Sequence, residues 1–138
     1  MTQTIFDGNV SPMVVKKDWG TLRICYVGKF AVQIIDVLPN EALSLQVHLQ
    51  KDEVYVTFEG TGRLEMGMHG EAVHLLSKGV VVHVPHRTVH RLIAEENGIT
   101  IVEVSTGQIT DVVRLDDRYG RQINRDLDVS HYLKILGK

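Results

Sequence analysis

The sequence contains little that would link the protein to a membrane, a nucleic acid or an oxidising compartment. Cys25 is the only cysteine among 138 residues, so no disulfide can form within the chain, which favours a reducing cytosol. The formal net charge is only −2 and no run of basic residues occurs, so nothing indicates nucleic acid or an anionic membrane surface. No apolar stretch approaches the length of a membrane span, and the first residues lack the basic start and apolar run of a signal peptide. We therefore expect a cytoplasmic protein with no nucleic-acid or membrane partner.

Short β-type runs follow one another along most of the chain, and Val, Ile, Leu and Thr dominate them, as in half-buried strands. Turn residues, Gly60 and Asn97-Gly98 among them, separate the runs, and no helical segment lies between them, which predicts an all-β sandwich or barrel. The length fits one domain, 1–138, that buries its own core. The predicted strands are residues 22–27, 31–38, 43–50, 54–58, 62–66, 72–76, 80–84, 89–94 and 99–105.

The last stretch of the chain differs from the rest. Apolar residues recur near helical spacing over residues 125–137, with Asp126 and Asp128 at the start and Gly137 at the end. This pattern predicts a short C-terminal helix, which covers one end of the barrel or reaches a partner subunit.

A row of polar side chains lies on one face of a predicted strand. Because successive residues of a strand point to opposite faces, Ser44, Gln46, His48 and Gln50 share one face, and apolar residues share the other. In a barrel, a polar row opposite an apolar row predicts a wet, functional interior. Glu53 follows after a two-residue turn, so it can face the same cavity from the start of the next strand.

His90 opens another predicted strand, and a closed barrel can bring it opposite His48 and Glu53. Two imidazole nitrogens and a carboxylate suit Zn²⁺, Fe²⁺, Mn²⁺ or Ni²⁺, and open positions let such a metal hold a substrate. Gln50 can add a weak carbonyl ligand. Spacing alone leaves another interpretation open, because a histidine on a strand is often a surface or hydrogen-bonded structural residue.

The spacing of these residues resembles the two sequence motifs of the cupins. Glu53 is followed after six residues by Gly60, and Gly79 is followed by Pro85 and then by His90. The surrounding residues are similar to the cupin domain of type II mannose-6-phosphate isomerases, which often occurs fused behind a mannose-1-phosphate guanylyltransferase. The similarity covers about Lys17 to Arg121 and rests on Trp19-Gly20, Leu43-Ser44-Leu45-Gln46, His90-Arg91-Leu92, residues 103–107 and residues 113–121.

The resemblance implies a cupin double-stranded β-helix, that is, a jelly-roll barrel, with a core of about residues 17–121 and a helical tail of about 125–137. It also implies that His48, Glu53 and His90 bind a divalent metal, either Zn, Mn, Fe or Ni. Where the family has His-His-His-Arg-Ala-Glu, this chain has Leu49 and Gln50 after its first histidine. Leucine cannot bind a metal, so the site is three-coordinate from protein, weak or empty.

The resemblance further implies a metal-dependent sugar-phosphate isomerase, with mannose-6-phosphate and fructose-6-phosphate as the leading substrate pair. Such an isomerisation moves a proton between adjacent carbons and needs a base. Glu103 is the candidate base, because a carboxylate among apolar strand residues is unusual unless it faces the cavity; the alternative is a structural ion pair with an arginine. Gln46, Lys51, Arg87 and Arg91 are the candidate substrate-binding residues, and the three cations are the candidates for the phosphate.

Arg87 stands where the family usually has a glycine, at the turn before the second motif's histidine. Glycine adopts positive φ at little cost and arginine does not, so we expect a differently shaped turn. Arg87 then either points at the cavity mouth or is a solvated loop residue. Arg91 follows His90 directly, so at most one of these two side chains readily faces the cavity.

Two other functions remain open on the sequence. Two histidines and one carboxylate also suit an iron-dependent cupin dioxygenase, and a barrel without turnover would be a non-catalytic sugar-binding module. All three functions require a small-molecule ligand. We expect a homodimer, because two-fold dimers are the commonest oligomers and similar small cupins are commonly dimers.

Overall fold

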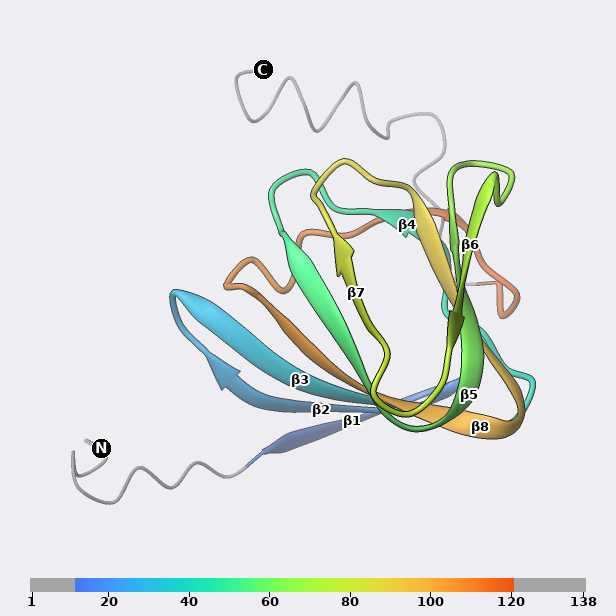
Figure 1. The fold of residues 1–138 in the computed structure, drawn as a ribbon. Coiled ribbons are helices and arrows are strands. Elements are labelled where there is room, and N and C mark those ends of the chain that lie inside the picture. The colour runs from blue at the N-terminus through green and yellow to red at the C-terminus, as the bar shows by residue number, and fades with distance from the viewer. Residues whose placement is uncertain (1–11, 121–138) are drawn as a thin grey trace.

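The computed structural model describes residues 12–120, and every helix or strand assigned within them is a β-strand (Figure 1). The strands form one sheet that curls into an open half-barrel, which confirms the predicted all-β class. No helix that could cross a membrane occurs in this range. The helix predicted over residues 125–137 lies outside the described residues. The strands are β1 (Met13–Lys17), β2 (Gly20–Val27), β3 (Phe30–Val37), β4 (Leu45–Val47), β5 (Glu53–Met66), β6 (Ala72–Leu76), β7 (Val81–Val84), β8 (His90–Thr106) and β9 (Val113–Asp116).

Two long strands, β5 and β8, run through both halves of the half-barrel. They pair antiparallel from Glu53 opposite Ser105 to Met66 opposite His90. In the half near Ser105, β3, β2 and β1 follow β8 in order, and β7 borders β5. In the half near His90, β4 and β9 follow β8, and β6 borders β5. This is the double-stranded arrangement that the sequence predicted.

The ladder between β5 and β8 is irregular at two glycines that the sequence placed in turns. Gly60 and Gly98 both have positive φ, +83° and +72°, which glycine alone adopts at little cost. A Cβ on Gly60 would lie 2.2 Å from the carbonyl oxygen of Gly98, so the two backbones approach more closely than any side chain allows. The register of β5 against β8 shifts between Gly60 and Gly62. The prediction of turns here was wrong, because these glycines mark a bulge inside continuous strands.

Burial alternates along the strands, as expected when one face lines the interior of a curled sheet. In β3, every second residue from Ala31 to Val37 is buried. The main core lies between the halves and includes Ile35, Tyr55, Leu64 and Ile101. Each such side chain contributes roughly 1.5–3 kcal/mol relative to an exposed one. A second, smaller cluster joins Val47, Leu49, Val113 and Leu115.

The strand predicted over residues 43–50 is shorter than expected: β4 covers only Leu45–Val47, although the backbone N–H of Leu43 still donates to the carbonyl oxygen of Leu92 on β8. Two strands were not predicted at all. Both β1 and β9 contain charged residues, which weaken an apolar pattern, and both lie at an end of the sheet. These two strands are relevant to function because each contributes a cationic side chain, Lys17 or Arg114, to the lining of a cavity.

Candidate metal centre

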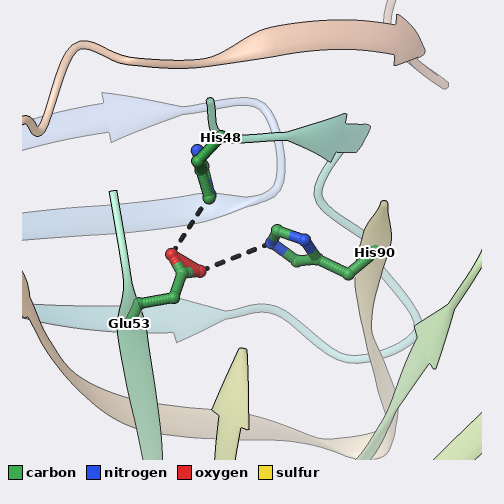
Figure 2. A group of neighbouring side chains, drawn as sticks. All are labelled: His48, Glu53 and His90. Carbon is green, nitrogen blue, oxygen red and sulfur yellow. Dashed lines mark ion pairs between the residues drawn. The ribbon is translucent and has the colours of Figure 1, made fainter. Parts of the chain in front are cut away.

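Three predicted ligands meet inside the half-barrel (Figure 2). His48 lies just after β4, Glu53 is the first residue of β5, and His90 is the first residue of β8. The Nε2 atom of His48 is 3.1 Å from Oε2 of Glu53, and Nε2 of His90 is 3.4 Å from Oε1 of the same carboxylate. All three residues are at most 1% exposed. One potential ligand atom from each lies within 4.8 Å of the others.

The other ring nitrogen of each histidine faces a backbone carbonyl oxygen. Nδ1 of His48 lies 2.6 Å from the carbonyl oxygen of Asp111, and Nδ1 of His90 lies 2.8 Å from that of Thr88. A carbonyl only accepts, so each Nδ1 carries the proton and donates it. In the neutral tautomer, each Nε2 therefore directs a lone pair toward Glu53. Metal-binding histidines are oriented by such hydrogen bonds from their second nitrogen.

The buried atoms at the centre lack hydrogen-bond partners. Neither oxygen of Glu53 nor Nε2 of His90 has one among the described residues. Burial raises the pKa of Glu53, but the neighbouring His48 and His90 outweigh this and hold it well below the usual range. A buried carboxylate that faces two histidine nitrogens needs a positive charge, either from a cation between the carboxylate and the nitrogens or from protonation of the histidines. The donor set of two imidazole nitrogens and one carboxylate fits a divalent metal.

A loop anchored by Asp111 positions His48. The carboxylate of Asp111 accepts three backbone hydrogen bonds, from Leu49, Gln50 and Lys51, at 2.7–3.1 Å. The side chain of Leu49 is 1% exposed and packs into the small apolar cluster. The residue that replaces a family histidine thus contributes to packing. Sequence reasoning missed Asp111, which lies about sixty residues beyond the loop that it holds.

Lys51 and Glu103 form a buried ion pair beside the centre. The Nζ atom of Lys51 lies 2.8 Å from Oε1 of Glu103 and 3.3 Å from Oε2 of Glu53, and Nε2 of Gln33 donates to Oε2 of Glu103 at 3.2 Å. Burial opposes the charge on Lys51, but Glu103 and Glu53 outweigh it and raise the pKa of the lysine. Burial also raises the pKa of Glu103 to about 8; Glu53 adds to this rise and Lys51 opposes it. The structural ion pair considered for Glu103 exists, but its partner is a lysine.

A cavity of about 140 Å³ opens next to the centre. His48, Gln46, Lys51 and Glu103 line it, so four of the predicted site residues share one space. Gln46 contacts two neighbours on the cavity wall: its Nε2 is 3.5 Å from Nε2 of His48, and its Oε1 accepts from Ser44 at 2.8 Å.

Three other predicted site residues, Gln50, Arg91 and Arg87, lie outside the cavity lining. Gln50 is exposed in the bend after β4, because the strand whose alternation would have placed it beside His48 ends at Val47. Arg91 donates to the carboxylate of Asp116 at 3.1 Å, on the face opposite to His90. Neither residue lines the cavity.

Arg87 is exposed and also lies outside the cavity lining. Its φ is +67°, so the turn keeps the left-handed backbone that favours glycine. The expectation of a differently shaped turn was therefore wrong. The backbone N–H of Arg87 donates to the carbonyl oxygen of His48 at 2.6 Å, and this tie holds the turn against the loop.

Several cavity residues were missed by sequence reasoning. Gln33 and Tyr55 face the interior from β3 and β5, and Lys17 and Arg114 reach the cavity from β1 and β9. Strand alternation from Glu103 outward could have found Gln33 and Tyr55, because both pair directly with Glu103. Nothing in the local sequence indicated Lys17 or Arg114, since neither strand was predicted.

Comparison with known proteins places the chain in a family. The family model described as Mannose-6-phosphate isomerase C-terminal matches residues 10–117. Mannose-1-phosphate guanylyltransferase ManC of Salmonella typhimurium is 35% identical over 114 residues, which are 78% of this chain and 23% of that protein. Alginate biosynthesis protein AlgA of Pseudomonas aeruginosa is 31% identical over 120 residues, 83% of this chain and 24% of that protein. The chain spans about a quarter of the length of these relatives.

Solved structures agree on the fold. The capsular polysaccharide assembling protein CapF from Staphylococcus aureus has a TM-score of 0.65 at 14% identity, over 81% of this chain and 34% of that one. A cupin-2 domain from Rhodospirillum rubrum has a TM-score of 0.62 at 16% identity, over 94% of this chain and 84% of that one. The fold is therefore a cupin. Together with the family match, this shows that the chain belongs to the mannose-6-phosphate isomerase C-terminal family.

Proposed function

We propose that this cupin is a metal-dependent sugar-phosphate isomerase, with mannose-6-phosphate and fructose-6-phosphate as the leading pair. The observation that carries the proposal is the buried group His48, Glu53 and His90, in which both oxygens of Glu53 and Nε2 of His90 lack hydrogen-bond partners among the described residues. Of the three, His48 also lines the cavity that Glu103 lines. The family description and the name of the relative ManC support a mannose phosphate as the ligand.

His48, Glu53 and His90 would hold the metal. A divalent metal held there would supply Lewis-acid stabilisation of the negative charge that develops on the sugar during the reaction. In its ionised form, Glu103 would take the proton from C2 of the aldose and return it to C1, while the proton of the C2 hydroxyl moves to the C1 oxygen, so that the carbonyl passes from C1 to C2. Lys51 and Gln33 each hold one oxygen of Glu103, which fixes the direction of the carboxylate. Gln46, beside His48, would donate to a sugar hydroxyl.

Metal content and turnover test this proposal together. Elemental analysis of the purified chain should give about one divalent metal per chain, and His48→Ala and Glu53→Ala should lose it. With the metal loaded, nuclear magnetic resonance should detect conversion of mannose-6-phosphate into fructose-6-phosphate and the reverse. Metal-loaded protein that leaves both sugars unchanged would exclude the isomerase. Oxygen uptake by the iron-loaded chain would instead indicate a dioxygenase.

One observation favours a second candidate, a non-catalytic sugar-binding module. Lys51 already brings a positive charge to within 3.3 Å of Glu53, so part of the need for a cation is met by the protein itself. In that case a sugar phosphate binds in the cavity without metal and without turnover. Calorimetric binding of mannose-6-phosphate to chelator-treated protein, with an affinity equal to that of the untreated protein, would support this candidate.

A further inference from the structure

We infer that Lys17 and Arg114 form a phosphate-binding site in the wall of the cavity, and that the sugar end of the ligand points toward His48. This inference deepens the proposed function and rests on it for the choice of a sugar phosphate. Neither residue was among the candidates suggested by the sequence. Both line the same cavity as His48, Gln46 and Glu103.

The three cations predicted for the phosphate differ in where the structure places them. The ammonium of Lys51 lies 2.8 Å from Glu103 and 3.3 Å from Glu53, so its charge balances two buried carboxylates. Arg91 is paired with Asp116 outside the cavity. Arg87 is exposed on a turn and does not line the cavity. Of the long cationic side chains between residues 12 and 120, those that line the cavity are Lys17, Lys51 and Arg114.

The curl of the sheet brings Lys17 and Arg114 to one cavity although their strands are far apart in the sheet. Lys17 is the last residue of β1 and Arg114 lies in β9, and these strands stand at opposite ends of the strand order. Both side chains are half-buried. The two edges of the half-barrel thus each supply one cation to the cavity.

The register of β9 fixes the position of Arg114 relative to the candidate metal centre. Arg114 pairs with Gln46 across the β4–β9 ladder, which places their Cβ atoms about 5 Å apart. His48 follows Gln46 by two residues, or about 7 Å along an extended chain. Gln46 and His48 are therefore within reach of a ligand whose phosphate contacts Arg114.

The chemistry of the two side chains suits a phosphate. A guanidinium presents parallel N–H donors that match two phosphate oxygens, and a lysine adds a compact charge with three donors. Such contacts are stronger in a partly buried site than in bulk water. A neutral hexose offers no oxygen dianion to these groups, so the site should distinguish a sugar phosphate from the free sugar.

Titration calorimetry on the full chain tests the site with three ligands: mannose-6-phosphate, mannose and inorganic phosphate. Lys17→Gln and Arg114→Gln should each weaken binding of both phosphate-containing ligands at least tenfold and leave any mannose binding within twofold. Arg114→Lys, which keeps the positive charge but loses the parallel N–H donors of the guanidinium, should lose less phosphate affinity than Arg114→Gln. Lys78→Gln, on the exposed turn between β6 and β7, is the matched control and should change nothing. Thermal midpoints of all variants verify folding.

Three outcomes would overturn the site. These are mannose-6-phosphate affinities within twofold of the parent in both glutamine variants, loss of binding in Arg87→Gln instead, or a parent chain that binds neither phosphate ligand. The proposed function fails separately. Phosphate bound through Lys17 and Arg114 without isomerisation by the metal-loaded chain would remove the isomerase and retain the site.

Discussion

The two faces of one part of the sheet have opposite characters. Where β3, β8 and β5 lie side by side, Gln33, Glu103 and Tyr55 form a cross-strand row on the inner face, and all are at most 4% exposed. Their immediate neighbours Val32, Val104 and Val54 form the next row, which faces outward. In an ordinary one-sided sheet, the apolar residues face the interior and the polar residues face water. Here a carboxylate and an amide lie inside, and valines lie outside.

The difference shows that the two faces are stabilised in different ways. Polar atoms inside a protein are stable only when they are paired, so the inner face depends on the Lys51–Glu103–Gln33 contacts and on a charge at Glu53. The outer face continues with Ile34, Val102 and Val56 in one row and with Val81, which is 58% exposed. Apolar patches of this kind are typical of surfaces that meet another protein.

Removing the cation from the inner face should have the largest effect. Lys51→Ala leaves the carboxylates Glu103 and Glu53 buried with less compensation, and we expect a loss of about 3–5 kcal/mol in the free energy of unfolding. Urea denaturation measures it. Lys78→Ala, at an exposed position, should stay within about 0.5 kcal/mol of the parent. A Lys51→Ala loss below about 1 kcal/mol would mean that the inner polar row does not need this charge.

Removing the anchor of the His48 loop should have a smaller effect on stability but a visible one on metal binding. Asp111→Ala abolishes three charge-assisted hydrogen bonds, and we expect a loss of about 2–3 kcal/mol. Metal affinity should fall about 10–100-fold, because the loop positions a ligand. Competition with a chromophoric chelator measures this. Glu96→Ala, an exposed acid on β8, is the control. Unchanged metal affinity would show that His48 is positioned without the loop.

A charge on the outer face tests whether a second copy covers this face in the predicted homodimer. At the border of this face, Arg23 and Asp36 form an ion pair at 3.0 Å. Because this border carries both signs of charge, two copies can meet there without repulsion between like charges. Val104→Lys should weaken dimerisation at least tenfold, or about 1.4 kcal/mol, in sedimentation equilibrium. Val73→Lys, at a residue 49% exposed on β6, should not. A parent chain that sediments as a monomer would refute the dimer.

The smallest effect concerns the left-handed turn. Arg87→Gly relieves the positive φ of an arginine, and we expect stabilisation of up to about 1 kcal/mol in thermal or urea unfolding. Asn40 also has positive φ, +61°, but asparagine tolerates it, so Asn40→Gly should gain less. If Arg87→Gly destabilises the chain, contacts of the arginine side chain outweigh the backbone strain.

The sequence predicted the fold class and the three residues of the candidate metal centre, because those rest on local patterns. Strand alternation and motif spacing brought together His48, Glu53 and His90. The site residues that the sequence did not predict depend on the long-range register of the strands. Asp111 and Arg114 contact residues about sixty to seventy positions away, and only the pairing of β4 with β9 and the loop before β9 places them. Lys51 had the residue type of a phosphate ligand, but its burial between two carboxylates appears only in three dimensions.

The bulge at Gly60 and Gly98 has a consequence for the candidate metal centre. Glu53 and His90 stand at opposite ends of the β5–β8 ladder, thirteen residues apart along β5, which in a flat sheet would separate them by about 40 Å. Their ligand atoms are 3.4 Å apart because the ladder bends back on itself. The distance between these two ligands is therefore set by sheet curvature. Changes near two glycines outside the cavity lining would therefore alter the distance between two candidate ligands without changing either residue.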